Sequence, residues 1–261
     1  MSKIKKLDYI DDLGGTITSN LHILKHGLLY RSSHLSKLDD ENIDKLFSRY
    51  PLKYIVDLRT VEEIKQAPEK EKLPEGVNYY HFPLADDKAN PAVNKDNRLD
   101  ILNELVKLEG GVKSHITKLY RIVATSEMAI ASYKEIFHLL LNNKNNEAFD
   151  FHCTQGKDRT GILIVLILSV LGVSLNSAIN VYLSFNRYGV FRRIAIFLGM
   201  NVVVSPRKAV ALNALLTAKR KYINAAIDEI NKKFGSLDLY IKNIIGLTDE
   251  DIKQLRKQYV N

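Results

Sequence analysis

The hydrophobic and polar positions change pattern most sharply between residues 142 and 172. Residues 147–152 (EAFDFH) alternate polar and apolar side chains after a turn-forming run, NNKNN, at residues 142–146, which predicts a strand entering the core. Residues 161–172 (GILIVLILSVLG) are apolar on all sides. That stretch is too apolar for a surface helix and too short to span a bilayer. It therefore predicts a buried core helix that ends near Gly172.

The other periodic segments predict strands and helices in the first half of the chain and mainly helices in the second. Residues 39–41 are acidic and precede apolar positions at helical spacing as far as Pro51, which predicts a helix. Residues 54–59 (YIVDLR) are expected to form a buried strand, and residues 78–84 another strand. Further helices are expected at 99–108, closed by Gly110 and Gly111, in two segments before Asn142, from Ser205 and Pro206 to about Phe234, and after a capping box of Thr248 and Asp251.

This order of elements predicts an α/β fold. A mostly parallel sheet should be flanked by helices, with a helix-rich C-terminal half, and residues 1–261 should form a single domain. Residues 185–204 include Arg187, Arg192 and Arg193 among aromatic side chains. This segment suits a helical lid within 185–234, although a core helix with a basic outer face is the plainer interpretation.

The composition is that of an ordinary globular protein, with 46% hydrophobic and 26% charged residues among 261. The formal net charge of +8 favours anionic partners, but a solvated basic surface explains it equally well. Lysines and arginines are spread along the chain and tryptophan is absent, so a nucleic acid partner is not predicted. No apolar stretch follows the first residues, MSKIKK. We therefore expect no transmembrane segment, and a cytoplasmic protein or one exported without a recognisable signal peptide.

The single cysteine of the chain lies between the predicted strand and the core helix, in HCTQGKDRTG at residues 152–161. The strand brings Cys153 to its end, and the backbone N–H groups of the loop then lie at a helix N-terminus. Such a terminus binds phosphate and lowers the pKa of a thiol below its usual value of about 8.5. Arg159 carries a planar fork of donors that can bind two phosphoryl oxygens at once. The pattern predicts that Cys153 is a nucleophilic thiolate and that Arg159 orients a phosphoryl group.

Other interpretations of these residues fit less well. A lone cysteine is more often an inert buried side chain, but rarely one placed in such a loop. A zinc site would need further cysteine or histidine ligands at suitable spacing, and the histidines form no such cluster, so neither metal nor cofactor is expected. Gly156 and Lys157 look like part of a nucleotide-binding loop, which would need Ser or Thr in place of Asp158. A phosphate-binding adaptor without turnover is a further alternative, against which Cys153 and Arg159 both argue.

At these residues the chain resembles the bacterial tyrosine phosphatases related to the mycobacterial secreted protein tyrosine phosphatase B. One difference is that the Asn-aromatic-Arg of that family, ahead of the motif at residue 12, is replaced by Tyr9, Ile10 and Asp11. The resemblance covers nearly the whole chain, and it implies a cysteine-phosphatase-like fold and activity on phosphotyrosine, with some on phosphoserine, phosphothreonine or phosphoinositides. The matching motifs are HCTQGKDRTG (152–161), DLGG (12–15), RSS (31–33) with LS (35–36), DLR (57–59) followed by Glu62 and Pro68, and YL (182–183) with Asn186.

The group that protonates the leaving alkoxide or phenoxide is expected to be a carboxylic acid on a loop. Residues 85–98 form the longest segment without periodicity and contain Asp86, Asp87 and Asp96, and long loops often carry catalytic groups. Asp86 is the first choice, because it follows a predicted strand at the position that the resemblance implies for the acid. Asp158 competes, because it precedes Arg159 in the loop and resembles the acid of myotubularin-like lipid phosphatases.

The expected reaction is hydrolysis of phosphomonoesters through a cysteinyl-phosphate intermediate. Cys153 attacks phosphorus, Arg159 and the loop amides bind the equatorial oxygens, and the Thr160 hydroxyl assists departure of the thiolate. His152 should orient the loop through hydrogen bonds. Phosphotyrosine proteins or phosphoinositides are the expected partners, and phosphate analogues the expected inhibitors. The predicted substrate-binding residues are Thr154, Gln155, Gly156, Lys157, Asp158 and Arg159.

Overall fold

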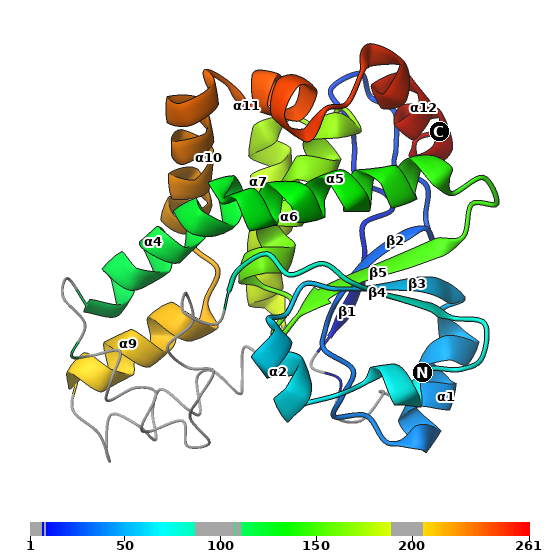
Figure 1. Cartoon of the computed structure of the whole chain (residues 1–261), viewed down its shortest axis with the longest axis horizontal. Helices are drawn as coiled ribbons and strands as arrows, with labels where there is room; N and C mark the ends of the chain where they lie inside the picture. The colour runs from blue at the N-terminus through cyan, green and yellow to red at the C-terminus, as the bar shows by residue number, and fades with distance from the viewer. Residues whose placement is uncertain (1–6, 8, 87–106, 108–110, 189–205) are drawn as a thin grey trace.

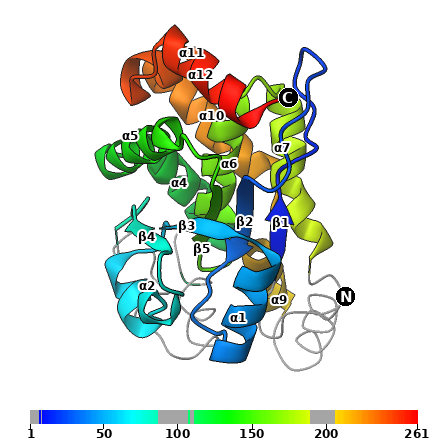
Figure 2. The ribbon, with the colours of Figure 1, turned by 90° about the vertical axis from the view of Figure 1, so that its right-hand side faces the viewer.

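A five-stranded sheet of order β1-β2-β5-β3-β4 forms the centre of the protein (Figure 1, Figure 2). The structure is a computed structural model, and it describes residues 7, 9–86, 107, 111–188 and 206–261. β1 (Ile10–Asp12) pairs antiparallel with β2 (Leu29–Ser33). β2, β5 (Ala148–Cys153), β3 (Leu52–Asp57) and β4 (Asn78–His81) pair in parallel. The prediction of a mostly parallel sheet is therefore confirmed.

Helices cover both faces of the sheet, which lies almost edge-on in Figure 1. α1 (Asp40–Arg49) and α2 (Val61–Gln66) lie below it. The larger helical layer lies above it and comprises α4 (Gly111–Thr125), α5 (Glu127–Asn142), α6 (Asp158–Val170), α7 (Leu175–Leu183), α10 (Arg220–Phe234) and α12 (Asp249–Tyr259). α9 (Pro206–Leu216) lies beside the end of the sheet, and the short helices are η1 (Lys70–Lys72), η3 (Ser184–Arg187), α11 (Leu237–Leu239) and η4 (Tyr240–Ile245).

The alternation in β5 separates two environments. Phe149, Phe151 and Cys153 belong to the large core under α5 and α6, whereas Ala148 belongs to the smaller core under α1. Because side chains alternate along a strand, Asp150 and His152 lie on the face of Ala148. The predicted core helix is α6, whose apolar residues are buried on all sides. Gly172 follows it with a φ of +90°, a conformation that glycine adopts readily and that ends the helix.

Several predicted boundaries are confirmed and others are shifted. The helix after Asp39 and the capping box of Thr248 and Asp251 are present, as are two helices before Asn143. β3 and β4 end earlier than predicted, at Asp57 and His81. The helix predicted at 99–108 lies mostly outside the described residues. The pattern missed β2 because this fully buried strand contains an arginine and two serines (LYRSS).

The prediction of one helix from 205 to about 234 is wrong. Two helices, α9 and α10, are separated at residues 217–219. The Asn186 side chain accepts from the Ala218 backbone N–H at 2.9 Å and donates to the Ala218 carbonyl at 2.8 Å. The Lys219 N–H donates to the Tyr182 hydroxyl at 3.1 Å. These partners are distant in sequence and the break contains neither glycine nor proline, so nothing local predicted it.

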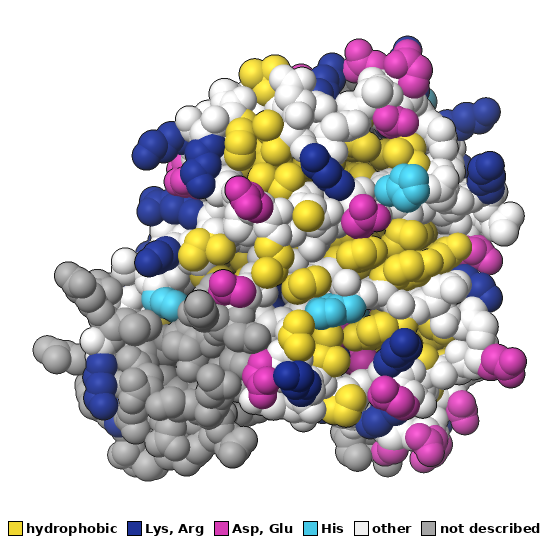
Figure 3. Space-filling model, in the orientation of Figure 1, with side chains coloured by type: hydrophobic (Ala, Val, Ile, Leu, Met, Phe, Trp, Pro, Cys, Tyr) yellow, Lys and Arg dark blue, Asp and Glu magenta, His cyan; other side chains and the backbone are white. Residues whose placement is uncertain are grey.

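The described surface mixes charges of both signs. On the face drawn in Figure 3, Lys and Arg side chains lie among Asp and Glu side chains and do not form a single patch in the described part. Among the residues that the structure describes, no helix combines the length and apolar character needed to cross a bilayer.

Candidate active site

The loop from Cys153 to Arg159 joins the end of the central strand β5 to the start of α6. Gly156 has a φ of +61°, and a Cβ there would lie 1.9 Å from the Ser32 carbonyl oxygen, so only glycine fits. The Gly156 carbonyl accepts hydrogen bonds from the Tyr9 hydroxyl at 2.5 Å and from Arg31 Nη2 at 2.9 Å. The N-terminal segment and β2 therefore hold the turn of the loop.

Cys153 is buried in the floor of this loop, with 2% of its surface exposed. Burial opposes the charged form of the thiol, but the Arg159 charge and the side-chain and backbone hydrogen bonds from Thr160 favour it and outweigh burial. The pKa of Cys153 is therefore lowered, which agrees with the predicted thiolate. Among the described residues the buried Thr160 hydroxyl has no other hydrogen-bond partner. It is thus available to the sulfur.

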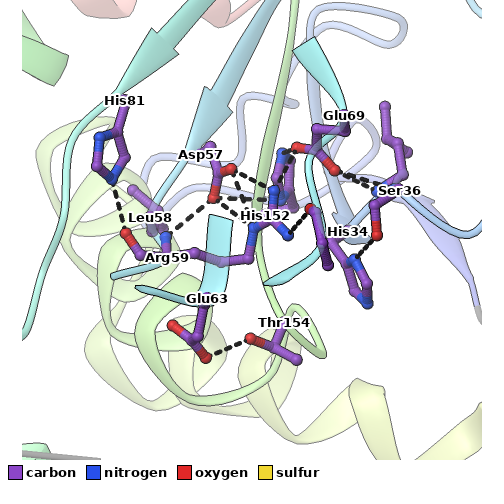
Figure 4. Close-up of polar contacts among 12 residues, drawn as sticks. His34, Ser36, Asp57, Leu58, Arg59, Glu63, Glu69, His81, His152 and Thr154 are labelled. Atoms are coloured by element: carbon purple, nitrogen blue, oxygen red, sulfur yellow. Dashed lines mark hydrogen bonds and ion pairs between the residues drawn. The ribbon is translucent and has the colours of Figure 1, made fainter. Parts of the chain in front are cut away.

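Arg159 is fixed by a carboxylate from α2, Glu63. Arg159 Nη1 and Nη2 lie 2.5 and 2.8 Å from the two carboxylate oxygens of Glu63, and Nη2 lies 3.2 Å from the Thr154 hydroxyl. Thr154 also donates to Glu63 at 2.6 Å (Figure 4). Burial opposes the charged form of Glu63, yet Arg159 and Thr154 lower its pKa to about 2. Glu63 takes the Nη1–Nη2 edge of the guanidinium, and Thr154 shares Nη2, so these two side chains fix the orientation of Arg159.

Behind Cys153, on the α1 side of the sheet, a buried network of charges surrounds His152 (Figure 4). His152 Nε2 lies 2.8 Å from Glu69 Oε1, and Arg59 Nη2 lies 2.7 Å from Asp57 Oδ2 and 3.2 Å from Glu69 Oε1. Burial favours neutral His152, but Glu69 and Asp57 outweigh it and raise the pKa of His152 to about 10. The Tyr79 hydroxyl donates to Asp57 at 2.7 Å. The side chain of His152, the residue before Cys153, is therefore a buried cation that pairs with Glu69.

Asp57, Glu69 and His152 are residue types that bind metal ions, and their ligand atoms lie within 4.8 Å of one another. The Arg59 guanidinium already contacts both carboxylates. A metal ion would need a neutral His152, whereas the raised pKa keeps it protonated. These residues therefore do not fit a cation.

The other predicted site residues differ in their position relative to Cys153 and in their contacts. Asp158 begins α6, where the Tyr120 hydroxyl donates to its Oδ1 at 2.6 Å. Lys157 is buried, and its ammonium donates to the Leu215 carbonyl near the end of α9 and lies 3.4 Å from Asp158 Oδ2. Gln155 is half-buried in the turn. Asp86 is exposed beyond the end of β4, and Asp87 and Asp96 lie outside the described residues.

Sequence reasoning missed four residues that contact the loop: Glu63, Arg31, Tyr120 and Tyr9. A signal for Glu63 was present, because Thr60 and Glu63 form a capping box at the start of α2, directly after the DLR motif. Arg31 lies within one of the motifs of the family resemblance, but its buried contact with the loop depends on the pairing of β2 with β5. Tyr120 had no sequence signal. Of the predicted lid arginines, Arg187 is exposed after α7, and Arg192 and Arg193 are outside the described residues.

A cysteine at the carboxyl end of a central parallel strand, followed by a tight turn and an arginine at the start of a buried helix, defines a cysteine-phosphatase-like α/β protein. Residues 4–261 match the tyrosine phosphatase family, and the chain belongs to that family. The Triple specificity protein phosphatase PtpB of Mycobacterium tuberculosis is 27% identical to it, over 94% of either chain. A Cupriavidus necator protein named "Putative tyrosine-protein phosphatase" is 25% identical, over 95% of this chain and 84% of its own length. The protein is therefore a phosphatase.

Proposed function

We propose that this protein is a protein-tyrosine phosphatase that hydrolyses phosphomonoesters through a cysteinyl-phosphate intermediate, with residues 1–261 acting as one catalytic domain. The observation that supports this most directly is the environment of Cys153. Its pKa is lowered despite complete burial, by Arg159 and Thr160 in the same loop. A thiolate beside an arginine at the N-terminus of a helix is suited to in-line attack on a phosphoryl group.

In the first step the Cys153 sulfur attacks phosphorus, and the bond to the leaving oxygen breaks as that oxygen takes a proton. Arg159 and the loop amides neutralise the equatorial oxygens. In the second step water gives a proton to the carboxylate that supplied one in the first step and attacks phosphorus. Inorganic phosphate forms, and the sulfur departs as a thiolate stabilised by the Thr160 hydroxyl. Glu63 holds the guanidinium of Arg159 in place throughout.

We assign the proton transfer to Asp158 in preference to Asp86, the first choice from the sequence. Asp158 belongs to the loop and is the first residue of α6, and it lies close enough to Cys153 for its charge to raise the pKa of that thiol. Asp86 follows β4, which β3 separates from β5. A general acid matters most for a poor leaving group. Asp158→Asn should therefore lose far more turnover on phenyl phosphate than on nitrophenyl phosphate; if only Asp86→Asn shows this difference, Asp86 is the acid.

The substrate class is tested by phosphate release from phosphotyrosine, phosphoserine and phosphothreonine peptides and from phosphorylated inositides, with Cys153→Ser as the blank. We expect phosphotyrosine peptides to be hydrolysed best. Lys157 is among the substrate-binding residues that the sequence predicts, but its ammonium donates to the Leu215 carbonyl, so Lys157→Ala should not selectively remove inositide turnover. If phosphorylated inositides are hydrolysed and phosphotyrosine peptides are not, the protein is a phosphoinositide phosphatase that uses the same cysteinyl-phosphate mechanism. No release from any substrate would favour an adaptor.

A further inference from the structure

Two buried tyrosines connect the start of α6 to the break between α9 and α10. The Tyr120 hydroxyl on α4 donates to Asp158 Oδ1 at 2.6 Å, and the Tyr182 hydroxyl on α7 lies 2.8 Å from that of Tyr120. The backbone N–H of Lys219, in the break, donates to the Tyr182 hydroxyl at 3.1 Å. Both tyrosines are fully buried. A chain of three hydrogen bonds thus runs from Lys219 to Asp158.

The direction of this chain is fixed. Burial and the nearby Asp158 charge raise the pKa of both tyrosines, so each hydroxyl keeps its single proton. A backbone N–H can only donate and an ionised carboxylate can only accept. The Lys219 carbonyl is a poorer alternative acceptor for Tyr182, at 3.5 Å. Tyr182 therefore donates to Tyr120, and Tyr120 donates to Asp158.

The surrounding fold holds both ends of the chain in place. A Cβ at Gly161, the last residue of the catalytic signature, would lie 2.5 Å from Cδ2 of Tyr182, so glycine lets the Tyr182 ring pack against α6. At the other end, the Asn186 amide bonds both the N–H and the carbonyl of Ala218, the neighbour of Lys219. This gives the final glycine of the signature a physical role.

We propose that Tyr120 and Tyr182 are positioning residues for proton transfer by Asp158. With Oδ1 of Asp158 accepting from Tyr120, the transferable proton is carried by Oδ2, and rotation of the carboxyl group would break that hydrogen bond. Lys157 lies 3.4 Å from Oδ2 and retains the Leu215 carbonyl as an acceptor when Oδ2 is protonated. This proposal rests on the proposed function, in which Asp158 supplies the proton.

The test compares kcat and KM of the full chain on phenyl phosphate and nitrophenyl phosphate. Tyr120→Phe should lower kcat on phenyl phosphate about tenfold, the lower range for loss of a hydrogen bond to a charged group, and on nitrophenyl phosphate less than about twofold, with KM unchanged. Tyr182→Phe should give a smaller loss of the same kind. In an Asp158→Asn background, Tyr120→Phe should cause no further loss.

Tyr133→Phe is the matched control, because Tyr133 is also fully buried in the helical layer and its hydroxyl donates to the Val123 carbonyl at 2.8 Å. It should leave both rates unchanged. Equal losses on the two substrates, the same effect from Tyr133→Phe, or an additive loss in the Asp158→Asn background would overturn the proposal. If Asp158→Asn itself hydrolyses phenyl phosphate normally, the acid assignment fails with it. The covalent mechanism is tested separately, by Cys153→Ser.

Discussion

Replacing Glu63 with glutamine tests whether the fixed guanidinium of Arg159 is needed for catalysis. The two side chains are 11% and 9% exposed, and their oxygens and nitrogens lie 2.5 and 2.8 Å apart. Glu63→Gln keeps the shape of the side chain but removes the charge, and it turns an amide N–H₂ toward one nitrogen of the guanidinium. Arg159 then loses the carboxylate that binds both of its terminal nitrogens, and with it the fixed orientation of the guanidinium.

The pKa of Glu63 gives the size of the effect on stability. Lowering a carboxyl pKa from 4.5 to about 2 corresponds to about 3 kcal/mol, and breaking a buried ion pair costs about 3–5 kcal/mol. For a chain of this size, about 3 kcal/mol corresponds to a fall in Tm of roughly 6–10 °C. The folded-state pKa is depressed, so this contribution is present above about pH 5 and is lost as the pH falls toward 2. The stability difference between wild type and Glu63→Gln should therefore shrink over that interval.

The assay combines thermal unfolding at several pH values with kcat/KM on nitrophenyl phosphate. We expect a loss in kcat/KM on the order of a hundredfold, as for a misplaced catalytic group. Glu62→Gln is the control, because Glu62 is the neighbouring residue on α2, is 35% exposed and lies 3.8 Å from Lys65; it should change Tm by less than about 2 °C, since exposed pairs contribute little. If Glu63→Gln has nearly wild-type kcat/KM, Glu63 does not position Arg159 for catalysis.

Three further outcomes are expected. Cys153→Ser should have no turnover yet still bind vanadate, measured by calorimetry; turnover by this variant near the wild-type rate would rule out the covalent step. The wild type should lose activity in peroxide and regain it with a thiol. Gly156→Ala should lose more than about tenfold in kcat/KM, because its Cβ would meet the Ser32 carbonyl; a fully active variant would show that the turn adapts. Asn186→Ala should lower the free energy of unfolding by about 1–3 kcal/mol, since it leaves both backbone groups of Ala218 unpaired; an unchanged denaturation midpoint would contradict this.

The parts of the fold that the sequence predicted are those with strong local signals. The buried helix α6 and the strand β5 follow from hydrophobic periodicity alone, and the turn before β5 is marked by asparagines. The residues of the loop, from Cys153 to Thr160, could be assigned because they are contiguous in sequence. Strand β2 was not predicted because it buries polar side chains, which a hydrophobic pattern does not indicate. One of them, Arg31, donates a hydrogen bond to the Gly156 carbonyl of the loop.

The remaining features depend on contacts between distant parts of the chain. Glu63 lies 96 residues before Arg159 and reaches it only because β3 lies beside β5. The position of Lys157 could not be predicted, since a lysine in an anion-binding loop is expected to face the anion, whereas here α9 offers it a carbonyl at its last turn. The interruption between α9 and α10 likewise depends on Asn186 and Tyr182, which belong to another helical segment.

The hydrogen bonds to the Gly156 carbonyl also set the direction of a neighbouring donor. The Gly156–Lys157 peptide bond is trans, so its N–H points opposite to its carbonyl. Tyr9 and Arg31 hold that carbonyl and thereby turn the Lys157 N–H away from themselves. If the loop amides bind the phosphoryl group as proposed, anion affinity depends also on the segment just before β1, about 150 residues away in sequence. During refolding, the recovery of phosphate-analogue binding would therefore show when that segment has packed against the loop.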